Sequence, residues 1–404
     1  MAELKYWLWL TTRKGLGPAG ALAVLDHFIT PERAYYGDRE DFKLLELPSF
    51  VKSSLLDKSM DVPNQILGDC DRLGMRVMTF QDADYPQRLR QIDIPPVVLY
   101  IKGKTFRFDE EAAIGIVGAR KSSQASQRRA EAFAMELAAN GALVVSGIAE
   151  GIDCHAVRGA LKGGGPVVSV LAGGADMRFP KENRFLYDDV AAAGALISEY
   201  PPGTPHKGDH YNPRNRILSG LCLGVLAVEC QPYGGTMLTV NHALEQGREV
   251  YAIPIGLEES CARGTNRLIH DCKARLVERP EDILRDYVEL FPTKLARLAP
   301  LPRPVVEARL SEPEDKPREK PEPPAPGTDR REVIPLSQQK SRFTDDELAI
   351  LAAAAAKPLT ADEIVEKIQI PARYVLSALT MLQVQGAVEE RSGRRFYSLV
   401  RLES

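Results

Sequence analysis

The stretch A-I-G-I-V-G-A-R-K-S-S at residues 113–123 decides the fold of the central part of this 404-residue chain. Its apolar run over 113–117 predicts a buried strand, Gly118 allows a tight turn, and the two serines open a helix expected over 123–140. A strand that passes through a glycine turn directly into a helix is the repeating unit of a parallel α/β sheet.

Further apolar runs continue this alternation along the chain. Strands are expected at 143–146, 167–171, 195–198, 223–228 and 249–253, with a weaker candidate at 274–277. Helical patterns separate most of them, as at 153–162 before Gly163 and at 237–246 before Gly247. Strands this apolar are buried on both faces, so the sequence predicts a doubly wound, Rossmann-like parallel sheet within residues 111–295.

Four other segments complete the expected organisation. Residues 1–70 read as short helices at 5–10, 20–28, 42–47 and 51–56, forming a small helical domain, and residues 71–110 form a bridge. Residues 296–342 hold ten prolines between 300 and 335 among alternating charges and predict a disordered linker. Residues 343–404 suggest three helices and a small hairpin, which describe a winged helix.

The turn Gly15-Leu16-Gly17-Pro18 lies between the first two expected helices. Glycine can adopt positive φ there and proline can open the next helix. In helix-hairpin-helix modules such a turn presents backbone N–H groups to a DNA phosphate, yet the same string also joins helices in proteins that do not bind DNA. Both interpretations stay open.

Composition excludes several classes of protein. The net charge is −3, so any nucleic-acid site must be a local concentration of cations. The six cysteines form no C-x-x-C pair, which favours free thiols over a metal site. The chain has neither an export signal nor an apolar run of about 18 residues, so we expect a cytoplasmic protein without a membrane span.

The loops that follow the expected strands carry the candidate binding residues. Helix N-termini at this edge of a sheet offer unpaired N–H groups and a positive dipole end, which favour phosphate. Small residues, amides and cations recur there. We predict a DNA-binding edge made of Gly118, Arg120, Lys121, Ser146, Gly147, Gly173, Lys181, Asn183, Arg184, Arg214, Asn215, Arg216, Gly235 and Thr236.

Two details of this edge bear on chemistry. Asp153 is expected to cap the helix after the second strand rather than to act in catalysis. Arg214 and Arg216 suit either phosphate contact or pairing with carboxylates such as Glu199 or Glu229, and the sequence does not choose between these roles.

No catalytic or cofactor site is expected. The first loop does not match G-x-G-x-x-G, and the second strand ends in Ser146-Gly147 rather than in a ribose-binding acid, which disfavours NAD. The acids of these loops, Glu150, Asp153, Asp176 and Glu182, lack the spacing of a metal site, and neither they nor the nearby histidines 155, 206 and 210 suggest a hydrolase. The edge therefore reads as a binding site for a phosphate backbone.

The same loops resemble those of the DNA-processing protein A (DprA/Smf) family. The matching motifs are G-I-V-G-A-R at 115–120, S-G-I-A-E-G-I-D at 146–153, F-P-K-E-N at 179–183, S-E-Y-P-P-G at 198–203, R-N-R-I at 214–217, G-G-T-M-L-T at 234–239 and G-T-N-R-L-I at 264–269. The chain departs from the family at Val157, where a His is usual, at Gly234-Gly235 in place of Ser-Gly, and at 254–256 in place of Pro-Gly.

The resemblance implies a role that the residues alone do not give. Such proteins bind and protect single-stranded DNA during natural transformation, help to load the RecA recombinase, and commonly dimerise through the Rossmann-like domain. Residues matching Arg120 and Lys181 lie in the family's DNA-binding pocket, so the resemblance implies DNA contact for these two.

Two alternatives remain open. A nucleotide-binding hydrolase of the phosphoribohydrolase type shares a Gly-Gly-Thr loop, but it carries a Glu shortly afterwards, whereas the next acid after Thr236 here is Glu245. A DNA-binding regulator would act through residues 343–404. That segment has seven Lys or Arg against nine Asp or Glu, and its expected third helix has only Arg373. A protein-interaction or accessory role is favoured for it, since duplex binding would depend on Arg391, Arg394 and Arg395.

Overall fold

The computed structural model describes residues 3–256, 263–295, 332–391 and 395–403. The chain divides into two compact units, residues 1–313 and residues 314–404.

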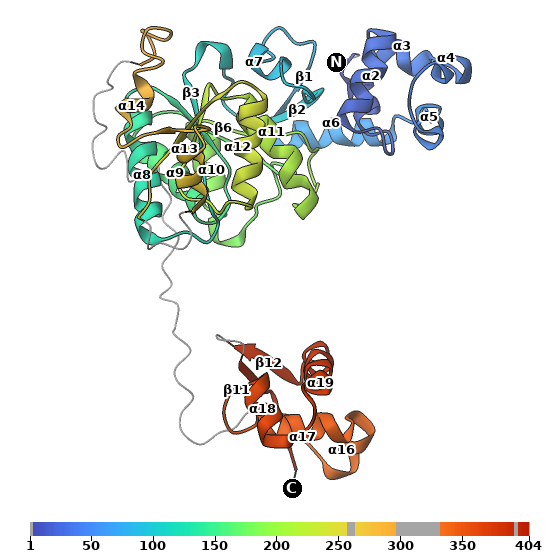
Figure 1. Ribbon diagram of the computed structural model, residues 1–404. Coiled ribbons are helices and arrows are strands. Elements are labelled where there is room, and N and C mark those ends of the chain that lie inside the picture. Colours follow the sequence, from blue (N-terminus) through green and yellow to red (C-terminus); the bar gives the residue numbers. More distant parts are fainter. Residues whose placement is uncertain (1–2, 257–262, 296–331, 392–394, 404) are drawn as a thin grey trace. The chain divides into compact units, whose positions relative to one another are not determined.

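The first unit is built on one nine-stranded sheet with the order β1-β2-β6-β5-β4-β3-β7-β8-β9 (Figure 1). The strands from β3 to β9 all run parallel. Their bounds are Ala113–Val117 (β3), Leu143–Ser146 (β4), Val167–Leu171 (β5), Ala195–Ser198 (β6), Gly224–Ala227 (β7), Glu249–Ala252 (β8) and Arg275–Leu276 (β9). The expected Rossmann-like sheet is confirmed, including its short seventh strand.

The strand order reverses between β3 and β7, so the sheet is doubly wound. Helices α8 (Gln124–Ala139), α9 (Ile152–Lys162) and α10 (Leu186–Ala193) share one core layer with the sheet. Helices α11 (Tyr211–Gly220), α12 (Gly235–Glu245) and α13 (Arg263–His270) share the layer on the opposite face. Such a reversal creates a crevice at the carboxyl edge of the strands, where ligands bind in open α/β sheets.

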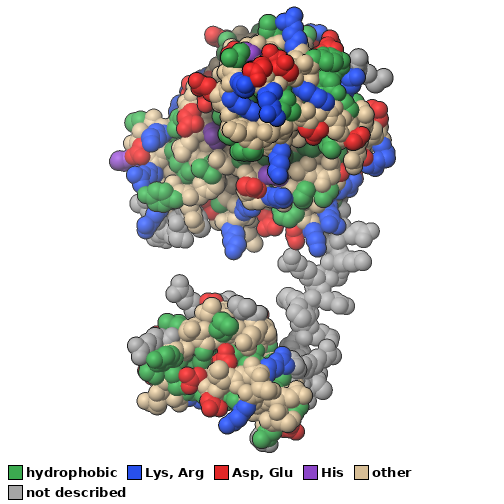
Figure 2. Space-filling view, turned by 90° about the vertical axis from the view of Figure 1, so that its right-hand side faces the viewer, with side chains coloured by type: hydrophobic (Ala, Val, Ile, Leu, Met, Phe, Trp, Pro, Cys, Tyr) green, Lys and Arg blue, Asp and Glu red, His purple; other side chains and the backbone are tan. Residues whose placement is uncertain are grey.

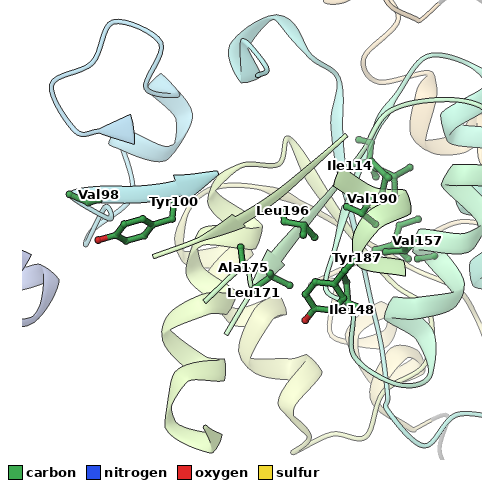
Figure 3. Packing of buried hydrophobic residues seen from close by; sticks show 14 of the residues in the cluster. Val98, Tyr100, Ile114, Ile148, Val157, Leu171, Ala175, Tyr187, Val190 and Leu196 are labelled. Carbon is green, nitrogen blue, oxygen red and sulfur yellow. The ribbon is translucent and has the colours of Figure 1, made fainter. Parts of the chain in front are cut away.

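Successive residues of each strand face opposite layers, because side chains alternate along a strand. In β3, Ile114 and Ile116 belong to one layer, whereas Ala113 and Val117 belong to the other. Figure 3 shows part of the first layer, in which Val190 of α10 lies near Leu196 of β6. Val157 of α9 is fully buried in the same layer.

The segment expected as a bridge is part of this sheet. Strand β1 (Met75–Thr79) pairs antiparallel with β2 (Val98–Gly103), and β2 pairs antiparallel with β6. Between them, the short helix α7 (Gln87–Arg90) directs Arg88 into the protein, where its guanidinium donates to the carbonyls of Glu111 and Leu221. Strands β1 and β2 are short, apolar and paired with the sheet, so residues 75–103 extend it.

The N-terminal helices pack against this extended edge. Their bounds are Leu4–Thr11 (α1), Gly17–Phe28 (α2), Pro31–Tyr36 (α3), Arg39–Lys43 (α4), Ser49–Leu55 (α5) and Asp61–Leu73 (α6). Trp7 and Leu10 share one hydrophobic cluster with Tyr100 of β2, so the helices and the sheet form a single compact unit. The expected glycine turn is present, with φ of +78° at Gly15 and +61° at Gly17.

The second unit is a winged helix, as expected. Its helices are α17 (Asp345–Ala353), α18 (Ala361–Ile368) and α19 (Ala372–Val384), and its sheet has the order β11 (Leu359–Thr360), β13 (Arg395–Ser398) and β12 (Val388–Arg391). Hydroxyl groups of Thr344 and Thr360 cap α17 and α18 in capping boxes. The expected wing residues 392–394 lie outside the described residues.

The predicted linker is too long at its C-terminal end. Strand β10 (Glu332–Ile334) pairs in parallel with β14 (Val400–Leu402), and helix α16 (Leu336–Arg342) follows it. Ile334 is only 1% exposed in the winged-helix core. One apolar pair beside many prolines is too short a pattern to predict a strand. The rest of the predicted linker, 296–331, lies outside the described residues.

Candidate nucleic-acid interface

The predicted DNA-binding residues lie in the loops and helix starts that follow β3 to β7, at one edge of the sheet. They differ in exposure. Arg120, Lys121, Lys181, Arg184 and Gly235 are exposed, whereas Ser146, Asn183, Arg214, Asn215 and Arg216 are buried. The structure therefore separates side chains that can contact a ligand from side chains that hold the loops together.

The loop after β3 is closed by the loop after β7. Glu229, 1% exposed, accepts hydrogen bonds from the Ser123 backbone amide at 3.0 Å and from its hydroxyl at 2.9 Å. The Ala119 amide donates to the Glu229 carbonyl at 2.8 Å. The N-terminus of α8, which the sequence suggested for phosphate, is thus occupied by a carboxylate of the protein itself. Arg120 and Lys121 are the cations of this loop that are exposed to an anion.

Glycines allow this loop to lie directly on α9. A Cβ atom at Gly118 would come within 2.4 Å of the Ile152 side chain. Gly151 has a φ of +77°, and a Cβ there would be 2.3 Å from the carbonyl oxygens of Ala119 and Arg120. Because Gly118 has no side chain, the loop packs closely against α9, and this packing fixes the backbone position of Arg120.

Asp153 is not the helix cap that the sequence predicted. The N-cap of α9 is Gly151, and Asp153 lies inside the first turn. Its buried carboxylate accepts hydrogen bonds from the backbone amides of Gly118 and Gly147 and faces the guanidinium groups of Arg214 and Arg120. Burial raises the pKa of Asp153 to about 6, although the two arginines oppose that shift. Asp153 thus ties together the loops after β3 and β4.

Arg214 is a structural residue of the same cluster. A Cβ atom at Gly147 would lie 2.5 Å from an Asp153 carboxylate oxygen and 2.8 Å from the Arg214 guanidinium, so only glycine fits there. The Arg214 guanidinium also donates to the Val170 carbonyl and, at 3.1 Å, to the side-chain oxygen of Asn215.

Arg216 resolves the choice that the sequence left open. It forms a buried ion pair with Glu199, with nitrogen to oxygen distances of 2.7 and 2.8 Å. Burial raises the pKa of Glu199, and Arg216 opposes that shift. The partner of Glu229 is Ser123 rather than an arginine. The R-N-R-I motif therefore packs inside the protein, because two buried carboxylates, at 153 and 199, need nearby cations.

The loop after β5 presents Lys181 at the surface. Lys181 and Asn183 belong to the short helix η2 (Lys181–Asn183). Asn183 is buried, and its amide donates to the Ile148 carbonyl at 2.9 Å, which ties this loop to the one after β4. Lys181 and Arg184 are exposed. Asn183 is thus a support, while the two cations can reach a phosphate.

A cavity of about 90 Å³ opens beside these cations, and its aromatic lining was not predicted from the sequence. Arg120, Arg214, Phe179, His206 and Tyr211 all line it. The Arg120 guanidinium lies over the Tyr211 ring, 4.3 Å from its centroid. The Phe179 and His206 rings stack, with centroids 5.4 Å apart. A search for phosphate-binding residues selects cations and glycines, whereas F-P in F-P-K-E-N is the sequence signal for an aromatic wall.

The remaining predicted residues have varied environments. The Ser146 hydroxyl donates to the Ile116 carbonyl at 2.6 Å. A Cβ atom at Gly173 would lie 2.7 Å from the His206 ring, so this glycine makes room for that side chain. Gly235 is exposed at the first position of α12, and Thr236, half-buried, follows it.

Among the described residues of this edge, acidic side chains do not gather into a catalytic group. Asp176 accepts hydrogen bonds from the Gly203 amide, and Glu150 and Glu182 are exposed. Among the described residues, no group of three or more His, Cys, Asp or Glu side chains could hold a metal ion. No helix of the described chain is long and apolar enough to cross a membrane.

The charges of the first unit do not form a field of one sign on the face shown in Figure 2, where basic and acidic side chains are interspersed. The exposed cations of the carboxyl edge that can attract a polyanion locally include Arg120, Lys121, Lys181 and Arg184.

Comparison with known proteins identifies the family. The family model described as "DNA recombination-mediator protein A" matches residues 76–288, more than half of the chain, and the model described as "DprA winged helix domain" matches residues 317–394. Protein Smf of Synechocystis is 29% identical over 98% of both chains. DNA processing protein DprA of Bacillus subtilis is 36% identical over 54% of this chain and 72% of its own length.

A solved structure has the same fold. The X-ray structure of DNA processing protein A from Streptococcus pneumoniae has a TM-score of 0.62 and 28% sequence identity, covering 70% of this chain and 97% of that one. The resemblance of the loops to the DprA/Smf family is thereby confirmed. The chain belongs to the family described as DNA recombination-mediator protein A.

Proposed function

We propose that this chain binds single-stranded DNA through the carboxyl edge of its sheet and acts in DNA processing during natural transformation. The observation that carries the proposal is the combination of exposed Arg120 and Lys181 with a cavity lined by aromatic side chains. Cations that follow the backbone, together with aromatic rings that stack on bases, are what sequence-independent binding of single strands requires.

The proposed role is non-enzymatic. The chain would protect incoming single strands and help to load the RecA recombinase, acting as a cytoplasmic homodimer. Support comes from the recombination-mediator description of the family and from the use of Asp153, Glu199 and Glu229 as loop supports rather than reactive groups.

Two observations weigh against the alternatives. A phosphoribohydrolase would need an acid close after Thr236, and the α8 terminus that could bind a nucleotide phosphate already holds Glu229. A duplex-binding regulator would present several cations on the third helix of its winged helix, whereas the sequence of α19 contains one, Arg373. We propose an accessory or protein-binding role for that unit.

The test is a fluorescence-anisotropy titration of single-stranded and duplex DNA at two salt concentrations. Arg120→Ala and Lys181→Ala should weaken binding to single strands of any sequence. The slope of log affinity against log salt should fall by about 0.7 for each phosphate that the variant no longer neutralises. Arg128→Ala, an exposed cation within α8 rather than in a loop, is the matched control. Unchanged affinity in both edge variants, or release of free base from a nucleoside monophosphate, would reject the proposal.

A further inference from the structure

We propose that Phe179, supported by His206, is the surface on which an unpaired nucleobase stacks. This inference rests on the proposed function and specifies how the site distinguishes single strands from duplex. It assigns bases to the aromatic cavity and phosphates to the exposed cations beside it.

Phe179 is held in a position suited to stacking. Its side chain is 47% exposed, and its ring packs on His206 with an angle of 28° between the two planes. The Tyr187 hydroxyl lies 3.1 Å from the Phe179 amide nitrogen and 2.9 Å from its carbonyl oxygen, which fixes the backbone that carries the ring. An aromatic ring on a fixed backbone, with much of its surface in solvent, can take a base without ordering a loop first.

His206 is in turn held by its surroundings. One ring edge lies against Gly173, where a Cβ atom would be 2.7 Å away. Its Nε2 atom lies 2.9 Å from the Met177 carbonyl oxygen, so Nε2 carries the hydrogen and donates it. Burial lowers the pKa of His206, which favours the neutral ring at neutral pH. A neutral, fixed imidazole supports the Phe179 ring without attracting a phosphate into the cavity.

Arg214 also lines the cavity, but its guanidinium already donates to the Val170 carbonyl and to the Asn215 side chain. The rest of the lining suits a base better than a phosphate. Ile148, Leu171 and Ala172 provide buried apolar surface, and Glu150 contributes a carboxylate to the same cavity. A carboxylate repels a phosphate, whereas carboxylates accept hydrogen bonds from the amino groups of bases. Arg120 lies at the rim of the cavity over Tyr211, where its guanidinium can contact a phosphate next to the stacked base.

This division of the site explains a preference for unpaired strands. The bases of a duplex are already stacked and paired, and taking one out costs a few kcal/mol. Any free base offers an aromatic face to Phe179, so the preference is for single strands and not for a sequence.

The experiment compares a 20-nucleotide thymidine oligomer with an abasic oligomer of equal length, at one salt concentration. Phe179→Leu keeps an apolar side chain but removes the ring. It should weaken binding to the thymidine oligomer roughly 5- to 100-fold, the range typical for removal of one stacked base, and leave the abasic oligomer unaffected. Unchanged abasic binding also shows that the variant is folded. Phe50→Leu, which removes a ring that is 60% exposed in the N-terminal helices, should change neither affinity.

A second variant reports stacking directly. Phe179→Trp should retain the affinity for thymidine, and its emission should be quenched by the thymidine oligomer but not by the abasic one. The native tryptophans, Trp7 and Trp9, are buried in α1 and give a constant background.

The outcomes separate this inference from the proposed function. The stacking role would be overturned if Phe179→Leu bound the thymidine oligomer as tightly as the wild type does, or if its affinity for both oligomers fell by the same factor. Weaker binding by Arg120→Ala and Lys181→Ala would still support the proposed function. If the Arg120 and Lys181 variants bind both oligomers normally, the proposed function itself fails.

Discussion

The Glu229 carboxylate accepts hydrogen bonds from both the backbone amide and the hydroxyl of Ser123, at 3.0 and 2.9 Å. These hydrogen bonds cross the point where the strand order of the sheet reverses, between β3 and β7. In dinucleotide-binding sheets a phosphate of the ligand lies at the corresponding helix N-terminus. Here a carboxylate of the protein neutralises that end of α8, which leaves ligand binding to side chains farther along the loops.

Replacing Glu229 should therefore destabilise the first unit. Glu229→Ala removes the acceptor for both the amide and the hydroxyl of Ser123, the N-cap of α8, so we expect the free energy of unfolding to fall by about 1–3 kcal/mol. Urea denaturation followed by circular dichroism measures it. Glu182→Ala, which removes an exposed carboxylate at the same edge, should be nearly neutral. Equal stability of the two variants would show that the hydrogen bonds to Ser123 contribute nothing.

The buried pair of Arg216 and Glu199 predicts a pH-dependent effect. Burial raises the pKa of Glu199 above its ordinary value of 4.5 even with Arg216 beside it, so ionising this group favours the unfolded chain, and more strongly when Arg216 is removed. Arg216→Ala should cost about 3–5 kcal/mol at pH 8, because it leaves a buried charge unpaired. The destabilisation should shrink as the pH falls toward 5, where protonated Glu199 is increasingly populated.

Urea titrations of Arg216→Ala and wild type at pH 5, 6.5 and 8 test this sign. Adding Glu199→Gln to the variant should recover part of the stability at pH 8, since it removes the unpaired charge. A destabilisation that grows as the pH falls would contradict the assignment.

The packing of α8 on α9 depends on Gly159. A Cβ atom there would lie 2.2 Å from the Glu131 carbonyl oxygen and 2.9 Å from its Cα, both of them backbone atoms of α8. Gly159→Ala should therefore push the helices apart and lower stability by at least about 1–3 kcal/mol. Gly68→Ala provides the matched control, because Gly68 lies within α6 with nothing within 4 Å of the added atom. That substitution should be neutral or stabilising by up to about 1 kcal/mol, and thermal unfolding of the two variants gives the comparison.

The corrected start of the winged-helix unit can be tested with two neighbouring residues. Ile334→Ala removes a side chain that is 1% exposed in the winged-helix core, whereas Val333→Ala alters one that is 54% exposed. Ile334→Ala should lower the stability of the second unit by about 2–5 kcal/mol and leave the first unit unchanged. Differential scanning calorimetry of the full chain would resolve the two transitions. If neither variant changes the second unit, strand β10 does not contribute to its core.

Most of the sheet could be predicted because its signals are local. Buried parallel strands are short apolar runs, and the helices between them are followed by glycines, such as Gly141 and Gly163. The place of β1 and β2 in the sheet could not be predicted, because β2 joins the sheet through β6, about a hundred residues away in sequence, and β1 pairs with β2 alone. Pairing over such a distance leaves no local pattern beyond an apolar run.

The candidate site divides in the same way. By itself, the sequence determined the doubly wound sheet, the loops that carry the site and the exposed cations Arg120 and Lys181, because strand ends and glycine turns fix where such loops occur. The partners of the buried charges depend on the tertiary structure: Arg216 pairs with Glu199, and Glu229 holds Ser123, the N-cap of α8. The tertiary structure also brought Phe179, His206 and Tyr211 around one cavity. A side chain's partner depends on residues from other strands and helices, and the cost of burying an unpaired charge selects that partner only once the chain has folded.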